Sequence, residues 1–486
     1  MPVHLAINQG LSSSARVAGF PGPADLGVVS ALVPPELVRQ VVAGCGRAEQ
    51  RVRALPAVLV AYFVIGLALF SGQGYREVLR KITGGVPGGC RIATSSALSR
   101  ARRRLGPEPL EKIFSELCAT AAAQQQPHAR AFGRQLVLAS MDGTIMNVPD
   151  TAANVAAFGE PALIGGGYGG GQAGYPQVRL LALIACGTRA LLAAAFGPRS
   201  TSEHALARTA AAQGTAIAGT LILADRNFGG YPLVSHFSSL GADLIWRIRA
   251  DRVLARIAQF SDGSYLSVIP ETQEGRRLAM ARHRGRPAGR VPRGIPVRVI
   301  EADITITPAA GPPRTEYYRL ITTLHDTRKA PAAAIARTYA MRWHSETGYR
   351  ELKTSLRNRQ PVLRSAAPDG VTQEIWALLT AHQITQLTRA GAATRARAAS
   401  PPPDPARFSY TPALRAITRQ ITRGTPPRHP QHTAAAEILA DLLPARPPRS
   451  YPRGRKSSNT RRAAIKTSPP GPITCTITLR QPSTDP

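Results

Sequence analysis

Residues 135–250 alternate between strand-like and helix-like segments, and this order limits the fold more than any other feature of the chain. The strand-like runs are apolar, whereas the helix-like run begins at a Thr/Ser cap. In chain order the segments are a strand ending at Asp142, two strands joined at Gly187-Thr188, a capped helix over 201–213, a strand ending at Asp225 and a strand over 242–250. Alternation of this kind predicts an α/β domain.

A strand, a hairpin, a helix and a further strand in this order match the ribonuclease-H-like fold. In that fold the first and fourth strands are neighbours, so carboxylates at their ends can converge, and Asp142 and Asp225 occupy these ends. The following stretch, about 251–316, is rich in Arg, Gly, Pro and short alternating runs. We therefore expect a ribonuclease-H-like core that carries a β-rich insertion.

The segment YAMRWHSETGYRELK contains a second pattern. At about 100° per residue, four of its side chains share a helical stripe about 60° wide, namely Tyr339, Arg342, Glu346 and Lys353. Arg350 extends this stripe. The opposite face is small and apolar, with Met341, Gly348 and Leu352. The helix thus presents one carboxylate among cations and a phenol.

Three acids are candidates for metal chemistry: Asp142, Asp225 and Glu346. Three hard oxygen ligands plus water suit Mg²⁺. Two such ions about 3.5–4 Å apart can activate an attacking oxygen and stabilise a leaving one, and the cations of the stripe can hold phosphate oxygens. Other carboxylates fit less well. They are Glu351, which falls off the stripe, Asp150, which follows a proline in a loop, and Glu203, which a first-turn capping role explains.

The segments on either side of the core are expected to be helical. Residues 1–130 read as a mainly helical domain, and 366–444 as a C-terminal helical region. The uncharged run 54–70 is at the short limit for a membrane span, and we interpret it as a buried helix. Arginines within 100–104 suit either DNA-backbone contact or a solvated face. Residues 445–486 are rich in Pro, Arg and Ser, which predicts a basic disordered tail.

The spacing Tyr-x2-Arg-x3-Glu-x6-Lys resembles the signature helix of the insertion sequence four family of DDE transposases. Other blocks continue the resemblance, which spans about residues 30–360. They are RVRALPAVLVAYFVIGLALFSGQGYREVL, LVLASMDGT with PDTAANVAAFG, YPQVRLLALIACGTRAL, LILADRNFGGYPLV and GADLIWRIRA. The first of these resembles the N-terminal domain found in part of this family, so residues 1–130 are expected to bind DNA ends.

The resemblance implies a cut-and-paste DNA transposase with a catalytic domain over 131–365. Asp142, Asp225 and Glu346 would hold two Mg²⁺ ions, for which Mn²⁺ can substitute. Activated water would nick a transposon end, and the 3′-hydroxyl would attack target DNA, in some relatives through a hairpin. DNA phosphates would be held by Tyr339, Arg342, Lys353 and Arg350. Relatives that form hairpins stack a splayed base on an aromatic ring, and Tyr318 is the candidate here, with a strand-facing structural role as the alternative.

Charge indicates the partner. Lys and Arg number 61 against 29 Asp and Glu, a net charge of +32, which implies a polyanion and favours nucleic acid over a membrane surface. We expect double-stranded DNA as substrate, both terminal inverted repeats and target, a homodimer on DNA, and a cytoplasmic, nucleoid-associated protein. The glycine-rich run 165–174 lacks a Gly-Lys-Ser/Thr ending, so no ATP dependence is expected. A metal-dependent nuclease and a catalytically decayed DNA-binding relative remain the alternatives.

Overall fold

The structure is a computed structural model. It describes residues 26–51, 53–84, 93–124, 132, 136–160, 174–214, 217–284, 291–307, 312–358, 360–396, 407–423, 427–443 and 474–480.

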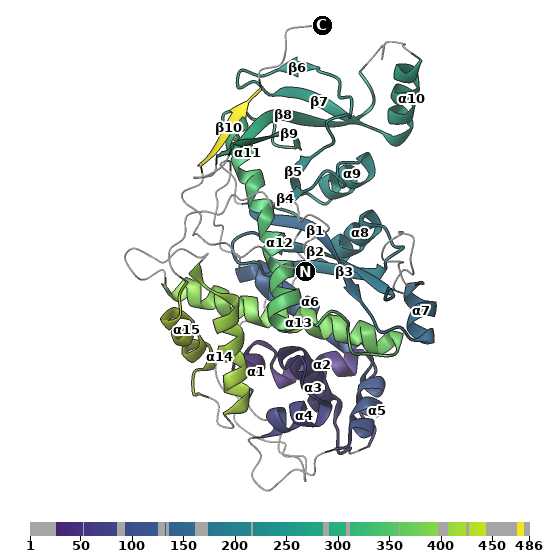
Figure 1. Cartoon of the computed structure of the whole chain (residues 1–486), viewed down its shortest axis with the longest axis vertical. Coiled ribbons are helices and arrows are strands. Elements are labelled where there is room, and N and C mark those ends of the chain that lie inside the picture. The colour runs from purple at the N-terminus through teal and green to yellow at the C-terminus, as the bar shows by residue number, and fades with distance from the viewer. Residues whose placement is uncertain are drawn as a thin grey trace.

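One ten-stranded sheet runs through the described part of the chain, with helices gathered at one end (Figure 1). Its strands follow the order β3-β2-β1-β4-β5-β9-β8-β7-β6, and β10 pairs with β8. The strands are β1 (Val137–Asn147), β2 (Gln177–Ala185), β3 (Leu191–Pro198), β4 (Thr220–Ala224), β5 (Asp243–Arg247), β6 (Ala258–Gln259), β7 (Tyr265–Pro270), β8 (Gly294–Thr307), β9 (Arg314–Thr322) and β10 (Thr474–Leu479).

The first five strands form the predicted ribonuclease-H-like core. β2 is antiparallel to β1 and β3, whereas β1, β4 and β5 run parallel. The capped helix is α8 (Glu203–Gln213), whose Ser202 side chain accepts a hydrogen bond from the N–H of Ala205. One expectation is wrong: β1 does not end at Asp142. It continues to Asn147 because its second half stays paired with β2 after pairing with β4 has stopped.

The predicted β-rich insertion extends the core sheet. β9 pairs with β5 and with β8, and β8 in turn pairs with β7. The insertion also holds one helix, α10 (Thr272–His283), and α9 (Tyr231–Ser239) lies between β4 and β5 in the chain. The sheet is therefore continuous from the core into the insertion.

The chain end contributes a strand that sequence did not predict. β10 lies inside 445–486, so the expectation of disorder is wrong for Thr474–Leu479. The remainder of that tail lies outside the described residues. β10 pairs with β8 along 302–307, and Arg480 makes a two-pronged ion pair with Asp303, with N–O distances of 2.6 and 2.8 Å. The sequence of the tail did not predict this strand because its pairing partner, β8, lies far away along the chain.

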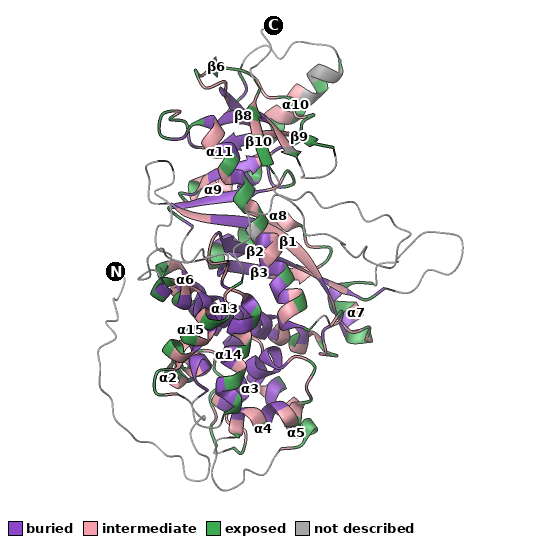
Figure 2. Cartoon of the chain, turned by 60° about the vertical axis from the view of Figure 1, so that its left-hand side comes forward, coloured by how far each residue is buried: buried purple, intermediate pink, exposed green. Residues whose placement is uncertain are grey.

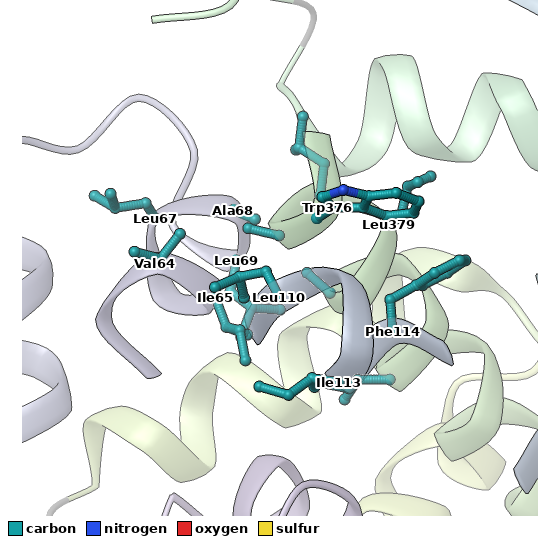
Figure 3. Close-up of a cluster of buried hydrophobic side chains, with 14 of the residues drawn as sticks. Val64, Ile65, Leu67, Ala68, Leu69, Leu110, Ile113, Phe114, Trp376 and Leu379 are labelled. Atoms are coloured by element: carbon teal, nitrogen blue, oxygen red, sulfur yellow. The ribbon is translucent and has the colours of Figure 1, made fainter. Parts of the chain in front are cut away.

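The helices around the N-terminal region form one core with helices from the C-terminal region. They are α1 (Val28–Leu32), α2 (Pro35–Gly44), α3 (Ala57–Leu69), α4 (Tyr75–Thr83), α5 (Ser95–Leu105), α6 (Glu108–Gln124), α7 (Ala152–Phe158), α13 (Pro368–Ala396), α14 (Tyr410–Thr422) and α15 (Pro430–Ala440). Side chains from α3, α6 and α13 interdigitate (Figure 3). The ring of Trp376 lies 5.4 Å from that of Phe114 and 4.8 Å from that of Phe196 on β3. The helical region is thereby packed onto the sheet.

The apolar run 54–70 forms α3, which is buried as predicted. Every residue of α3 except Val58 is buried, and purple covers this helix in Figure 2. None of the described helices combines the length and apolar character that a membrane crossing requires.

A buried ionic cluster joins the sheet to the C-terminal helices. Glu351 accepts from Arg189 of the β2–β3 turn and from Arg389 of α13, the latter at 3.2 Å. Gln386 donates to the other carboxylate oxygen at 2.9 Å. Although burial opposes ionisation, the two guanidinium groups lower the pKa of Glu351, while burial lowers the pKa of His382 to about 4. Glu351 is therefore a structural anion shared by two cations.

Replacement of Glu351 tests this assignment. Glu351→Gln leaves two buried guanidinium groups without their anion, and we expect a loss of about 3–5 kcal/mol in the free energy of unfolding, measured by denaturant titration. Glu77→Gln, which removes an exposed carboxylate paired with Arg80 and Lys81, should cost less than about 1 kcal/mol. Equal losses in the two variants would contradict a structural role for Glu351.

Candidate active site

The register of two parallel strands brings Asp142 and Asp225 together. The last paired residues of β1 and β4 are Met141 and Ala224, and each aspartate is the next residue in its strand direction. Neighbouring strands lie about 4.8 Å apart. Pairing over five residue pairs, in which only Ser140 and Thr220 are polar, therefore places the two aspartates next to each other where the strands separate.

Strand alternation sends Asp142 to the face covered by helix α11 (Ala332–Tyr339). Met141 and Ala224 are fully buried on the opposite face. Leu221 and Leu223 of β4 pack with α11 on the aspartate face. Asp142 and Asp225 thus lie on the face of the sheet that is covered by the helical segment with the predicted stripe.

That segment is helical but not uniform. α11 is followed by a 3₁₀ turn, η2 (Ala340–Arg342), then by α12 (Trp343–Arg350) and a π-helical turn, η3 (Glu351–Leu356). A 3₁₀ turn advances about 120° per residue, and a π turn advances less than an α-helix. As a result Met341, expected on the apolar back, is 37% exposed, whereas Gly348 and Leu352 are buried as predicted.

Helix α12 lies beside the sheet (Figure 1), and Tyr349 anchors it there through two hydrogen bonds. The hydroxyl of Tyr349 donates to the backbone carbonyl of Asp142 at 2.5 Å and accepts from the N–H of Ala182 at 3.0 Å. Gly348 faces Ile184 of β2, and a Cβ added there would lie at ordinary van der Waals distance, 3.4 Å, from the Ile184 side chain. That Tyr349 positions this helix was not predicted from the sequence. Its location on the same helix, three residues after Glu346, could have suggested such a role.

Arg342 joins two of the three acids. Its guanidinium lies 3.6 Å from a carboxylate oxygen of Asp142 and 3.5 Å from one of Glu346. The buried Ser345 hydroxyl lies 3.4 Å from Asp142 and donates to the carbonyl of Arg342 at 2.9 Å. The structure therefore brings Asp142 and Glu346 to one cation and adds Ser345 to the site, whereas the stripe predicted only that Arg342 and Glu346 share a face of the helix.

The charge state of Asp142 reflects this crowding. Burial raises the pKa of Asp142, and the negative charges of Asp225 and Glu346 raise it further. The N–H of Gly143 and the guanidinium of Arg342 act in the opposite direction. The two neighbouring carboxylates thus act on Asp142 in the same direction as burial, and a bound cation would act against them.

Asp225 is held by the turn that follows β4. One of its oxygens accepts from the N–H of Asn227 at 2.9 Å. The ring of His204 on α8 lies 2.7 Å from the carbonyl oxygen of Asn227. This turn is therefore anchored to the helix layer, and Asp225 remains partly accessible.

The aromatic residues of the site form a stack with an arginine. Tyr339 is 5% exposed, and its ring meets that of Tyr318 edge-on with 5.9 Å between centroids. The guanidinium of Arg247 lies 3.9 Å from the Tyr318 ring centre. Burial raises the pKa of Tyr339, and nearby Asp225 contributes in the same direction. Tyr318 thus has one ring face covered by a cation, and Arg247 is a neighbour that sequence reasoning missed.

The other predicted residues are distributed along the helix. Arg350 is exposed and Lys353 is half-buried. Of the alternative acids, Glu351 belongs to the buried ionic cluster, and Asp150 is exposed in a loop. Glu203 lies close to the backbone of Gly143, where an added Cβ would come within 2.9 Å of its carboxylate. Glu203 therefore approaches β1 next to Asp142, which its capping position alone did not predict.

The three carboxylates have the right chemistry for a hard divalent cation, but their oxygens do not surround a single point. Asp142, Asp225 and Glu346 supply carboxylate oxygens, the ligands that Mg²⁺ and Mn²⁺ prefer. Within the described ranges, no group of three or more His, Cys, Asp or Glu side chains is gathered tightly enough to hold a metal ion. The guanidinium of Arg342 lies between Asp142 and Glu346, which accounts for their separation.

Comparison with known proteins agrees with this geometry. Residues 134–384, just over half of the chain, match the family described as "Transposase DDE domain". Residues 23–115 match "Insertion element 4 transposase N-terminal". This chain belongs to the insertion sequence four family of DDE transposases. It is therefore an enzyme of the polynucleotidyl-transferase kind, and its substrate is DNA.

Two relatives of this transposase come from Escherichia coli (strain K12). "Transposase InsG for insertion sequence element IS4" is 26% identical over 426 residues, which cover 86% of this chain and 89% of that protein. "Putative transposase InsZ" is 24% identical over 251 residues, which cover 51% of this chain and 80% of that protein. The first similarity extends over both the helical region and the sheet.

The raised pKa of Asp142 has a measurable effect on stability. Because the folded pKa lies above the unfolded one, ionising Asp142 lowers stability as the pH rises through the folded pKa. Asp142→Asn should therefore melt at a higher temperature than wild type at pH 7, and the difference should vanish near pH 3. Asp150→Asn, with the same charge change in an exposed loop, serves as control. A destabilised Asp142→Asn at pH 7 would contradict the burial argument.

Proposed function

We propose that this transposase nicks DNA at the ends of its insertion sequence and joins the resulting 3′-hydroxyl to target DNA. The observation that carries the proposal is the meeting of Asp142 and Glu346 on one guanidinium, with Asp225 beside Asp142 in register. Acidic groups crowded in this way cost free energy unless they bind a cation. Such a cost is typical of functional sites.

In this proposal Asp142, Asp225 and Glu346 bind two Mg²⁺ ions, and Mn²⁺ can replace them. When bound, the ions supply Lewis-acid activation of the attacking oxygen and stabilise charge on the leaving oxygen. The protein orients these ligands. Tyr349 fixes the backbone of Asp142, Ser345 hydrogen-bonds its carboxylate, and the turn at Asn227 holds Asp225.

The cations of the helix are proposed to bind DNA phosphates near the cleaved end. Arg350 is exposed for this role, and Lys353 is partly so. Arg342 can exchange its carboxylate partners for a phosphate once divalent ions neutralise the acids. Tyr339 is buried beneath Arg342, so its contribution requires a phosphate that reaches its hydroxyl. A base that stacks on Tyr318 would have to share the ring with Arg247 on one face and with the adjacent Tyr339 ring.

The partners follow from charge and family. We infer binding to terminal inverted repeats and to target DNA, with a homodimer that holds two ends together. The net charge of +32 supports tight, salt-sensitive association with a polyanion. Association with the bacterial nucleoid in the cytoplasm is the corresponding location.

Loss of a metal ligand should separate binding from cleavage. Asp142→Asn is expected to reduce Mg²⁺-dependent nicking of a DNA end by about 10²-fold or more, with binding in a gel-shift assay within about twofold of wild type. Asp150→Asn, matched in chemistry but exposed in a loop, should nick normally. Nicking by Asp142→Asn at the wild-type rate would disprove the role of Asp142.

Joining distinguishes a transposase reaction from simple hydrolysis by a nuclease of the same fold. Pre-cleaved DNA ends carrying a free 3′-hydroxyl are mixed with plasmid target and Mg²⁺, and joined products are scored on a gel. We expect covalent joining by wild type and none by Glu346→Gln. Efficient nicking of uncut ends without any joining would favour the nuclease alternative.

A further inference from the structure

A hollow lies at the seam between the N-terminal helices and the catalytic domain. It measures about 380 Å³ with its solvent-filled mouth included, and inside it is wide enough for one water-sized group. Its walls come from the end of α3, from Arg102 of α5, from α13, and from the stretch after η3, which supplies Arg357, Gln360, Val362 and Arg364. Arginines dominate the polar lining: Arg102, Arg357 and Arg364, against the single acid Glu374.

Arg357 is the unusual member of this group. It is only 5% exposed, yet its Nη2 atom has no hydrogen-bond partner among the described residues. Burial lowers the pKa of Arg357 and the negative charge of Glu374 acts in the opposite direction, but Nη2 makes no hydrogen bond to that carboxylate, which accepts from Arg364 and Ser365. A buried charged donor without a partner is energetically unfavourable.

Arg102 provides the contrast in the same hollow. Its three guanidinium nitrogens donate to Gln373, to the Tyr75 hydroxyl, and to Ser365 and the carbonyl of Gly370. Arg364 donates to the carbonyl of Gln73 at 3.1 Å. The hollow therefore holds two arginines engaged by the protein and one with an unused donor.

We propose that Arg357 binds a non-bridging phosphate oxygen of the DNA backbone in this hollow. The inference rests on the proposed function, since it assigns a further subsite along the same bound DNA. A phosphate oxygen matches both the width of the hollow and the unused donor, and guanidinium is the side chain best suited to phosphate.

The position of the hollow is continuous with the acidic site. Arg357 follows directly on η3, which carries Lys353. Burial lowers the pKa of Lys353, and the charge of Arg357 lowers it further, so the two cations are close enough to repel. By helical rise Arg357 lies roughly 15 Å beyond Glu346, which corresponds to about four or five nucleotides of one DNA strand. The hollow is lined by Arg357 and not by Lys353, so a phosphate bound there would neutralise the charge of Arg357.

The salt dependence of DNA binding tests the subsite. Affinity for a 40-base-pair duplex of arbitrary sequence is measured across a series of NaCl concentrations, with full-length protein. Arg357→Gln should reduce the magnitude of the slope of log affinity against log salt by about 0.9, the contribution of one phosphate. Arg357→Lys should restore most of the slope.

Arg298→Gln is the matched control. Arg298 is a fully buried arginine in β8 whose guanidinium is bonded to Ser264, Asp262, Leu324 and Ala330. This variant loses the same charge, so it should be less stable but keep the wild-type slope. Equal slope changes in the two glutamine variants would show an effect of net charge and would overturn the subsite.

Melting curves in sodium phosphate and in sodium chloride of equal ionic strength identify the occupant. We expect inorganic phosphate to raise the melting temperature of wild type but not of Arg357→Gln. Stabilisation by free phosphate with an unchanged DNA slope would mean a free-anion site and would contradict the proposal. An unchanged slope without stabilisation would mean that water fills the hollow. Absence of any duplex binding by wild type would instead disprove the proposed function itself.

Discussion

The parallel pairing of β1 with β4 is the constraint on which the rest of the site depends. Five residue pairs, in which only Ser140 and Thr220 are polar, set a register that ends one residue before Asp142 and Asp225, and a slip of one residue would send each side chain to the opposite face. The strands thus place two like charges side by side at a cost that their hydrophobic packing offsets. The third acid lies near them because Tyr349 anchors α12 to β1 and β2.

Arg342 can bind either the carboxylates of the site or a DNA phosphate. In the structure it lies between two carboxylates, so acids that would otherwise repel are held near one point. The same guanidinium is suited to phosphate. Exchange of partners would couple DNA binding to charge neutralisation, since a divalent ion between the carboxylates would free Arg342 for the backbone. Two further cations follow along the chain, Lys353 within η3 and Arg357 directly after it, and Arg357 lies at the seam with the helical domain.

Sequence predicted the features that local pattern determines. The core strands, the capped helix α8 and the buried helix α3 follow from periodicity and spacing, and so does the shared helix face of Arg342 and Glu346. It failed where long-range contacts decide. Met341 is exposed because η2 rotates the helix more than an ideal wheel allows, and β1 extends past Asp142 because β2 continues to pair with it. β10 forms on an edge supplied by residues far away, and the unused donor of Arg357 depends on what its neighbours already bind.

The central proposal is that Asp142, Asp225 and Glu346 enclose divalent ions when DNA is bound, while Arg342 binds a phosphate. Anomalous scattering from Mn²⁺ in crystals of the protein bound to a DNA end tests this claim most directly. We expect Mn²⁺ peaks within about 2.0–2.2 Å of oxygens from Asp142, Asp225 and Glu346, and the Arg342 guanidinium hydrogen-bonded to a phosphate. Peaks bound elsewhere, or an Arg342 that still bridges Asp142 and Glu346 with DNA in place, would contradict it.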